Sequence, residues 1–249
     1  MANFGPAHAF ILVGGRNVTP DHYTLYETNE QILEQTNSLG DTWEEHLPVG
    51  IGKVGLEAAG GLYDNTVDRL MTAFQEKGAT LQIVDYGFEG ATTGTEGILL
   101  NGDYAASWKR IAERSGLTKA HALHTITGAR KSGTVLHGIS AETASSGTSA
   151  WYNHGSVTTG DIAGHLQLVA LTLGSAVSFT VTILDSSDNG TTITARLTFT
   201  ATTSAPNAYE QTATTGTKQY TAMRWVFNAS TSGAPTGTTA TPYVSIYRA

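Results

Sequence analysis

Apolar and polar residues alternate strictly along two neighbouring segments in the second half of the chain. Phe179, Val181 and Ile183 are separated by Thr180 and Thr182, and the same period of two recurs over 192–200. This pattern predicts strands with one buried face and one threonine-rich, solvated face. Asp-Asn-Gly at 188–190 predicts a hairpin turn between them. Further strands are predicted at 165–173, 219–227 and 243–247, which together make a β-sandwich.

The first half has shorter apolar runs and one helical pattern. Val67, Leu70, Met71 and Phe74 follow the i, i+3, i+4, i+7 spacing, which predicts a single helix over 65–76. The pattern over 104–115 fits either a short helix or a strand with a turn. Strands are predicted at 9–13, 23–36 and 42–47. A break is predicted at 48–52, and a further strand follows it up to residue 62. The remaining strands are predicted at 81–86, 120–126 and 134–139.

Composition changes near residue 147. Residues 1–147 contain 17 acidic and 10 basic residues, whereas residues 148–249 contain 4 of each, so the whole net charge of −7 lies in the first part. The intervening stretch 141–150, AETASSGTSA, is small and polar, as linkers are. We therefore predict a β domain with one helix at 1–147 and a separate Thr-rich β-sandwich at 148–249.

The residue inventory excludes several kinds of chemistry. The chain has no cysteine, which removes disulfides, thiolate catalysis and cysteine-ligated zinc. Its acidic balance disfavours binding to nucleic-acid phosphates. The G-x-G-x-x-G match at 50–55 lacks a following helical stripe, so it predicts a glycine-rich turn entering a strand. His121 and His124 would face opposite ways on a strand, and the loop at 185–190 lacks calcium-ligand spacing. The sequence predicts no enzyme activity, no cofactor and no metal site.

The segment 21–48 is long and polar, and few of its residues can anchor it in a core. An extended segment with unpaired strand edges favours pairing with a neighbouring subunit. We therefore predict an assembly arm there. The residues expected on the arm or facing a lumen are Glu27, Glu30, Glu34, Trp43, Glu44 and Glu45.

Several stretches, taken together and in order, resemble the tail tube (major tail) proteins of long, non-contractile-tailed bacteriophages. They are FGPAHAFILVGG at 4–15, NSLGDTWEEHLPVG at 37–50, GLYD at 61–64, GHLQL at 164–168, VTILDSSDNG at 181–190, LTFTA at 197–201 and VSIYR at 244–248. The resemblance implies a tube-forming β-sandwich with a flanking helix in 1–147, and a C-terminal sandwich decorating the exterior.

The resemblance also implies a structural role in the virion tail. Such subunits form hexameric rings that stack into a hollow tube, built in the host cytoplasm. The implied partners are further copies of the chain, the tape-measure protein, tail terminator and initiator proteins, and genome DNA that passes non-specifically during ejection. Carboxylates on the tube wall would repel phosphate and avoid counterion-release binding. No membrane partner is expected, since no run approaches the length of a membrane span.

An alternative from another functional class stays open. The chain could be a capsid decoration or adhesin-type surface-binding module whose second sandwich binds glycans, with aromatic residues such as Trp151 and Tyr209 stacking on sugar. Negative-stain microscopy separates the two hypotheses, because tubes or six-fold rings favour the tail protein and lasting monomers favour the module.

Overall fold

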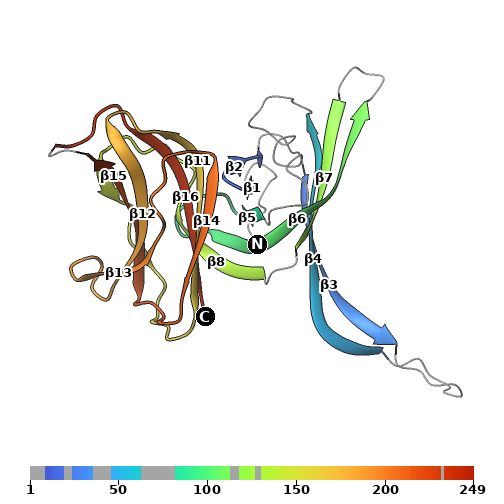
Figure 1. The fold of residues 1–249 in the computed structure, drawn as a ribbon. Helices are drawn as coiled ribbons and strands as arrows, with labels where there is room; N and C mark the ends of the chain where they lie inside the picture. The colour runs from blue at the N-terminus through green and yellow to red at the C-terminus, as the bar shows by residue number, and fades with distance from the viewer. Residues whose placement is uncertain are drawn as a thin grey trace, which may run out of the picture.

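The chain forms two β-sheets in a computed structural model that describes residues 9–19, 24–35, 46–62, 82–112, 118–126, 130–230 and 233–249 (Figure 1). Every regular element in these ranges is a strand. The strands are β1 (Phe10–Val13), β2 (Arg16–Asn17), β3 (Thr24–Gln35), β4 (His46–Leu62), β5 (Gln82–Gly87), β6 (Glu96–Ala112), β7 (Thr118–Ile126), β8 (Arg130–His137), β9 (Ser146–Thr148), β10 (Tyr152–Asn153), β11 (Ile162–Thr172), β12 (Ala176–Ser186), β13 (Ile193–Thr198), β14 (Asn207–Ala213), β15 (Tyr220–Ala229) and β16 (Thr239–Arg248).

The second sheet packs face to face on part of the first. Its order is β10-β15-β12-β13, with β9 also on β15. Across from it lie β14, β11, β16 and β8 of the first sheet. The shared core holds Phe179, Phe227, Leu166 and Val244, each at most 2% exposed. The rings of Phe179 and Phe227 lie 4.8 Å apart in a tilted arrangement, which favours aromatic contact beyond simple burial. The mainly β fold with a sandwich is therefore confirmed, and β8, which precedes the predicted boundary, is part of that sandwich.

The first sheet continues beyond β8 through β6, β5 and β1 to β2, and it curls back on itself. The turn after β1 shows the closure, because the Gly15 N–H donates to Gln167 Oε1 of β11 at 2.6 Å. A Cβ on Gly15 would come within 2.2 Å of the Asn207 backbone nitrogen, and its φ of +83° favours glycine. Inside the curl, Phe10 packs on Tyr243 with ring centroids 5.2 Å apart. As a result β11 and β16 are covered on both faces.

β6 belongs to two parts of the molecule. Its first residues pair with β8 and β5, up to the Asp103–Gln82 pair. From Asp103 to Ala112 it pairs instead with β7, which pairs with β4, which pairs with β3. These strands form a second layer, in the order β6-β7-β4-β3, that extends past the body at both ends in Figure 1. Before Val54, from His46 to Lys53, β4 is paired with β3 alone among the described strands.

Most predicted strands are confirmed, and the break expected in the first part is wrong. Of the two alternatives left open for 104–115, the structure has strand over 104–112. The break expected at 48–52 does not occur, because β4 runs without interruption from His46 to Leu62. Pro48 is tolerated there because β7 ends opposite Val54, so no described strand pairs with that side of β4 at Pro48 and no N–H is needed for a hydrogen bond there. The predicted helix 65–76 lies outside the described residues.

The β12–β13 hairpin is confirmed together with its turn. Asn189 and Gly190 have φ values of +53° and +92°, as a primed turn needs. The predicted burial of the apolar face is wrong at the start of β13, because Ile193 is 50% exposed. The strand register shifts between Ile183 and Leu184, and past this irregularity the side chains of β13 no longer follow the buried alternation.

The two parts on either side of residue 147 share hydrogen-bonded strands. β8 pairs with β16 through Ser245 opposite Val135 and Ile246 opposite Thr134. The stretch expected to be a linker also pairs, since β9 lies on β15 and Glu142 bridges Ala240. The boundary near Gly147 stays a prediction, and any division there has to cut one continuous sheet.

Candidate assembly edges and a buried polar cluster

The layer β6-β7-β4-β3 presents two long strand edges. β3 pairs with β4 from Thr24 to Gln35, and within the described part of the chain no strand pairs with its other side. On β6, the stretch after Asp103 pairs with β7 on one side, and no described strand occupies the other. Long unpaired edges present rows of N–H and C=O groups that readily pair with another chain.

The two edges are complementary in direction. Each neighbouring pair in the layer is antiparallel: β3 with β4, β4 with β7, and β7 with β6. With four strands alternating in this way, β3 and β6 run in opposite directions. The β6 edge of one copy can therefore lie beside the β3 edge of a second copy and continue the antiparallel order.

The predicted arm residues divide into two groups. Glu27, Glu30 and Glu34 lie on β3, where their Cα positions stand opposite Leu56, Lys53 and Leu47 of β4. Trp43, Glu44 and Glu45 lie outside the described residues. The expected arm is thus part of a paired ribbon, and the role of its carboxylates stays a prediction.

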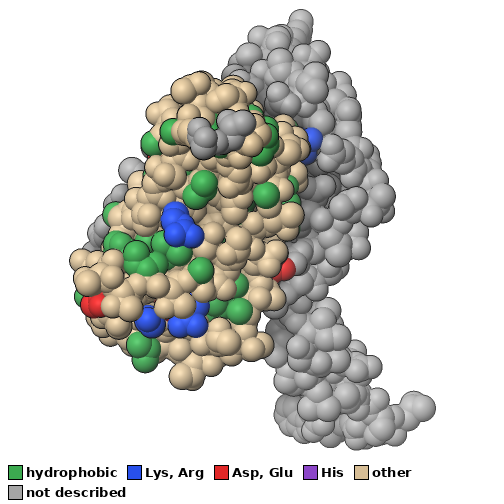
Figure 2. Space-filling model, turned by 60° about the vertical axis from the view of Figure 1, so that its left-hand side comes forward, with side chains coloured by type: hydrophobic (Ala, Val, Ile, Leu, Met, Phe, Trp, Pro, Cys, Tyr) green, Lys and Arg blue, Asp and Glu red, His purple; other side chains and the backbone are tan. Residues whose placement is uncertain are grey.

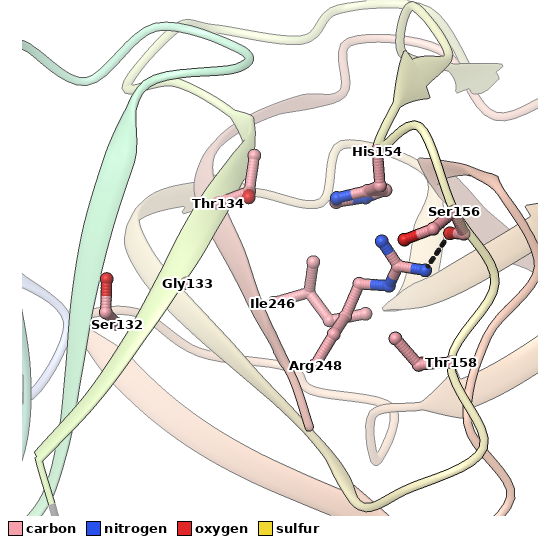
Figure 3. Close-up of a pocket in the computed structure, with 8 residues that line it drawn as sticks. All are labelled: Ser132, Gly133, Thr134, His154, Ser156, Thr158, Ile246 and Arg248. Atoms are coloured by element: carbon pink, nitrogen blue, oxygen red, sulfur yellow. Dashed lines mark hydrogen bonds between the residues drawn. The ribbon is translucent and has the colours of Figure 1, made fainter.

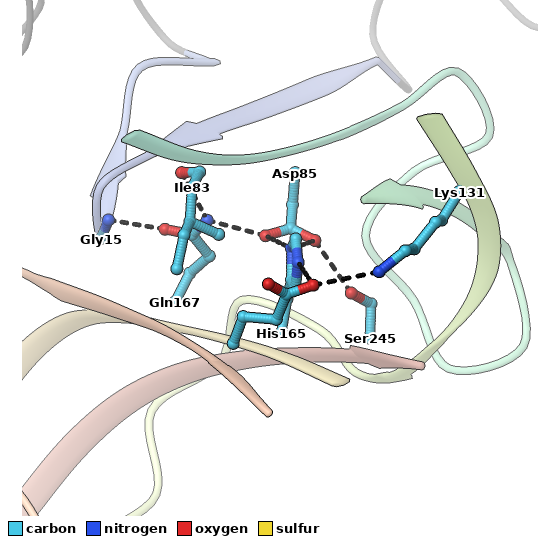
Figure 4. Close-up of polar contacts among 8 residues, drawn as sticks. Gly15, Ile83, Asp85, Lys131, His165, Gln167 and Ser245 are labelled. Atoms are coloured by element: carbon cyan, nitrogen blue, oxygen red, sulfur yellow. Dashed lines mark hydrogen bonds and ion pairs between the residues drawn. The ribbon is translucent and has the colours of Figure 1, made fainter. Parts of the chain in front are cut away.

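A polar cluster that the sequence did not predict is buried between β5 and β11 (Figure 4). Asp85 of β5 is fully buried, with both carboxylate oxygens 3.2 Å from His165 Nδ1. Gln167 Nε2 donates to Asp85 Oδ2 at 2.7 Å, and Ser245 Oγ donates to Oδ1 at 2.9 Å. Buried carboxylates require such partners, because an unpaired charge in the interior costs several kcal/mol.

The cluster reaches the surface through Glu210 and Lys131. His165 Nε2 lies 3.6 Å from Glu210 Oε1, within ion-pair range, and Lys131 Nζ lies 3.1 Å from the same oxygen. Burial alone would lower the pKa of His165, but the Asp85 and Glu210 carboxylates outweigh it and raise this pKa to about 9. The interaction with His165, ahead of that with Lys131, lowers the pKa of Glu210 to about 2. At neutral pH the imidazolium is therefore held between two carboxylates.

This arrangement is structural in character. His165 and Asp85 are fully buried, so neither has access to a substrate. The cluster joins β5 of the first part to β11, β14 and β16 of the second, across the predicted domain boundary. The sequence offered one sign of it: His165 and Gln167 alternate with Leu166 and Leu168, giving one polar and one apolar face. Nothing in the local pattern shows that Asp85, eighty residues earlier, covers the polar face.

The other candidate motifs do not make chemical sites within the described residues. The G-x-G-x-x-G match lies inside β4 and not in a turn, so the expectation of a turn is wrong and no helix start follows it within the strand. At the hairpin, Asp185 accepts from Arg196 Nε and from the Lys218 N–H, so it is already engaged. No group of three potential metal ligands occurs in the described ranges. Within the same ranges no helix is long and apolar enough to cross a membrane.

Comparisons with known proteins give only distant likenesses. No protein-family model matches the chain, and no curated protein matches it. Among solved structures, the tail of an empty GTA particle with C6 symmetry aligns at 10% identity and a TM-score of 0.30, over 43% of this chain and 76% of that one. SPP1 Dit (gp 19.1), described as a hub of the adsorption apparatus in phages infecting Gram-positive hosts, aligns at 10% identity and a TM-score of 0.33, over 97% and 99%. Likenesses this low carry no argument about function.

Proposed function

We propose that this chain is a structural subunit of a bacteriophage tail that assembles edge to edge into rings, which stack into a tube. The single observation that carries the proposal is the pair of open, oppositely directed edges on one four-stranded layer. The resemblance of the sequence to tail tube proteins supports the same role. It also supplies the expected setting: the virion tail, built in the host cytoplasm around a tape-measure protein between initiator and terminator proteins.

The edges favour rings over two-fold dimers. A β6-to-β3 contact joins two different surfaces, so each added copy leaves one edge of each kind free. Contacts of this head-to-tail type close into rings when the rotation between copies is suitable, and otherwise continue as filaments. Closure would also remove every exposed edge of the layer, which relieves the aggregation hazard of long unpaired strands.

The strand count is compatible with a hollow ring. Four strands from each of six copies would make a barrel of 24 strands, if the ring is hexameric as the resemblance implies. Barrels of about 16–18 strands already leave an aqueous channel, so a larger barrel has room for a passing polymer. The acidic residues of the first part, with Glu27, Glu30 and Glu34 on the edge strand, would keep DNA phosphates from binding the wall.

The C-terminal sandwich is proposed to lie on the outside of the tube. Its outward sheet face is dominated by uncharged side chains, with scattered basic residues and few acidic ones (Figure 2). Arg224 on β15 is an exposed member of that face. A nearly neutral face suits an exterior decoration, because it creates no strong electrostatic field that would attract other molecules or copies away from the assembly edges.

Cysteine pairing tests the contact directly, since the chain contains no cysteine of its own. Thr28→Cys places a thiol on β3, and single cysteines at successive positions of 104–112 place one on β6. Cα atoms of opposed antiparallel residues lie about 4.5–5.5 Å apart, within the range that a disulfide spans. Mixing the two kinds of variant under mild oxidation should give cross-linked pairs at one register of β6. Arg224→Cys, exposed but away from both edges, is the matched control.

The outcomes separate the possibilities. Cross-links between β3 and β6 variants, absent from either variant alone, together with rings or tubes in negative stain, support the proposal. Self-linking of Thr28→Cys would indicate a two-fold β3–β3 contact and would contradict ring assembly. Lasting monomers without cross-links at any position would favour the surface-binding module instead.

A further inference from the structure

A polar pocket opens where β8, β16 and the loop after β10 meet (Figure 3). Its volume is about 380 Å³, within the range of small-molecule sites. Hydroxyl groups dominate the wall, with one guanidinium, one imidazole and one apolar side chain. The lining residues are Ser132, Gly133, Thr134, His154, Ser156, Thr158, Ile246 and Arg248.

The guanidinium of Arg248 is fixed in place before any ligand arrives. Its Nη2 donates to the Ser156 carbonyl at 2.6 Å and to the Lys218 carbonyl at 3.3 Å, and its Nε donates to Thr217 Oγ1. The remaining nitrogen, Nη1, makes no hydrogen bond within the described part of the chain. In Figure 3 it points between His154 and Ser156. A preorganised donor of this kind loses little conformational entropy when it binds.

The loop that forms the opposite wall is also anchored at both ends. The His154 N–H donates to the Gln219 carbonyl at 2.9 Å, and the Thr158 N–H donates to the Thr217 carbonyl at 2.9 Å. His154 Nε2 lies 2.7 Å from Thr221 Oγ1, which orients the imidazole. The pocket is therefore preformed, and its polar groups keep their positions.

The charges around the pocket favour an anion. None of the lining residues is acidic. Asp185 interacts with Arg248 through its charge but is already bonded to Arg196 and the Lys218 N–H, and Glu96 at the rim accepts from Ser132. Burial, with the positive charge of Arg248 second, lowers the pKa of His154 to about 4. The imidazole is consequently neutral at pH 7 and able to hydrogen-bond with a hydroxyl group.

We propose that this pocket binds a small hydroxylated carboxylic acid of the sugar-acid class. The carboxylate would accept from Arg248 Nη1, since charge-assisted bonds of guanidinium to carboxylate are the strongest available here. The hydroxyl groups of the ligand would bond with Thr134, Thr158 and the His154 ring. The volume exceeds what a bare carboxylate fills, and the hydroxyl-rich wall matches a polyhydroxylated ligand rather than an apolar one.

Calorimetric titration of the full chain with glucuronate tests the assignment, with glucose and acetate as comparison ligands. Glucose lacks the charge, and acetate lacks the hydroxyl groups. Ser156→Asp places a carboxylate at the exposed rim beside Arg248 and should weaken glucuronate binding roughly tenfold or more. Thr159→Asp, an equally exposed neighbour outside the lining, adds the same charge and should change binding little. Arg248→Gln should abolish binding, with Arg224→Gln as its matched control.

Ser156→Asp keeps the test decisive even if Arg248→Gln unfolds, because Ser156 is exposed and its hydrogen bond with Arg248 uses the backbone carbonyl, which the substitution retains. Binding of glucuronate, with weaker binding of both glucose and acetate and a loss in Ser156→Asp alone, supports the proposal. It is overturned if glucose or acetate binds as tightly as glucuronate, if glucuronate does not bind, or if the two Asp variants behave alike.

Discussion

Raising the pH should destabilise the fold through His165. This imidazole lies between the carboxylates of Asp85 and Glu210, which raise its pKa from 6.5 to about 9 in the folded chain. In the unfolded chain it returns to its ordinary pKa. A raised pKa contributes stability that is fully present below pH 6.5 and is lost as the pH rises through 9.

The magnitude follows from the size of this difference. One pKa unit corresponds to 1.36 kcal/mol, so a rise from 6.5 to about 9 is worth on the order of 3 kcal/mol. Because the His165 side chain is fully buried, solvent screening reduces this contribution little. The pKa of Glu210, lowered to about 2, adds no slope in this range, since its contribution is constant above pH 4.5. The free energy of unfolding should therefore fall by about 3 kcal/mol between pH 6 and 10.

Urea unfolding at several pH values, followed by tryptophan fluorescence, measures this change. The comparison protein is His165→Gln, which fills the site with a neutral side chain. At pH 6 we expect it to be about 3–5 kcal/mol less stable, because Asp85 stays buried without its cation. Its stability should change less between pH 6 and 10 than that of the unaltered chain. Groups common to both proteins, such as the terminal amine, cancel in the difference.

The result that would refute this reasoning is a parallel pH dependence in the two proteins. If both lose the same free energy from pH 6 to 10, the slope comes from other groups and His165 is not held as a cation. Sedimentation at each pH has to show the same oligomeric state, because ring dissociation would add a separate pH dependence.

Three further predictions rest on other parts of the fold. Phe179→Ala should lower the free energy of unfolding by about 3–5 kcal/mol in urea, as is usual for a fully buried Phe; no change would place this ring outside the core. His154 has the opposite pH dependence, because its pKa is lowered from 6.5 to about 4 in the folded chain. Its contribution to the free energy of unfolding is present above pH 6.5 and is lost as the pH falls towards 4. The same unfolding assay checks this, since the free energy of unfolding of His154→Gln should fall less between about pH 7 and 4. The fragment 1–147 should not give a soluble folded protein by gel filtration and circular dichroism, because it leaves β8 without β16 and Asp85 without His165; a folded fragment would support a domain boundary near residue 147.

Local patterning was sufficient to predict strands that have one buried face and one solvent-exposed face. Phe179, Val181 and Ile183 are buried as the alternation predicts, and the Asp-Asn-Gly turn lies where expected. The same reasoning could not find β14, since its residues from Asn207 to Ala213 are nearly all half-buried and carry no alternating pattern. Such a strand is defined by pairing with β11, more than thirty residues earlier along the chain.

Long-range contacts explain the rest of what the sequence did not predict. Glycines and Pro48 suggested a break at 48–52, but pairing with β3 keeps β4 extended there. The apolar and charged residues mixed over 104–112 fit two local structures, and only the ladder with β7 selects the strand. The buried cluster and the Arg248 pocket likewise bring together residues distant in sequence, so no spacing rule within one segment could reveal them.

The double membership of β6 has a mechanical consequence. One continuous strand runs from the body into the projecting layer, so a pull on the body travels along its axis into the layer. Ladder hydrogen bonds in antiparallel sheets stand perpendicular to the strands, and such a load shears all those between β6 and β7 together instead of opening them one by one. A tube of these subunits that is bent or stretched would carry strain along the covalent backbone of β6, which no loop interrupts between the body and the layer.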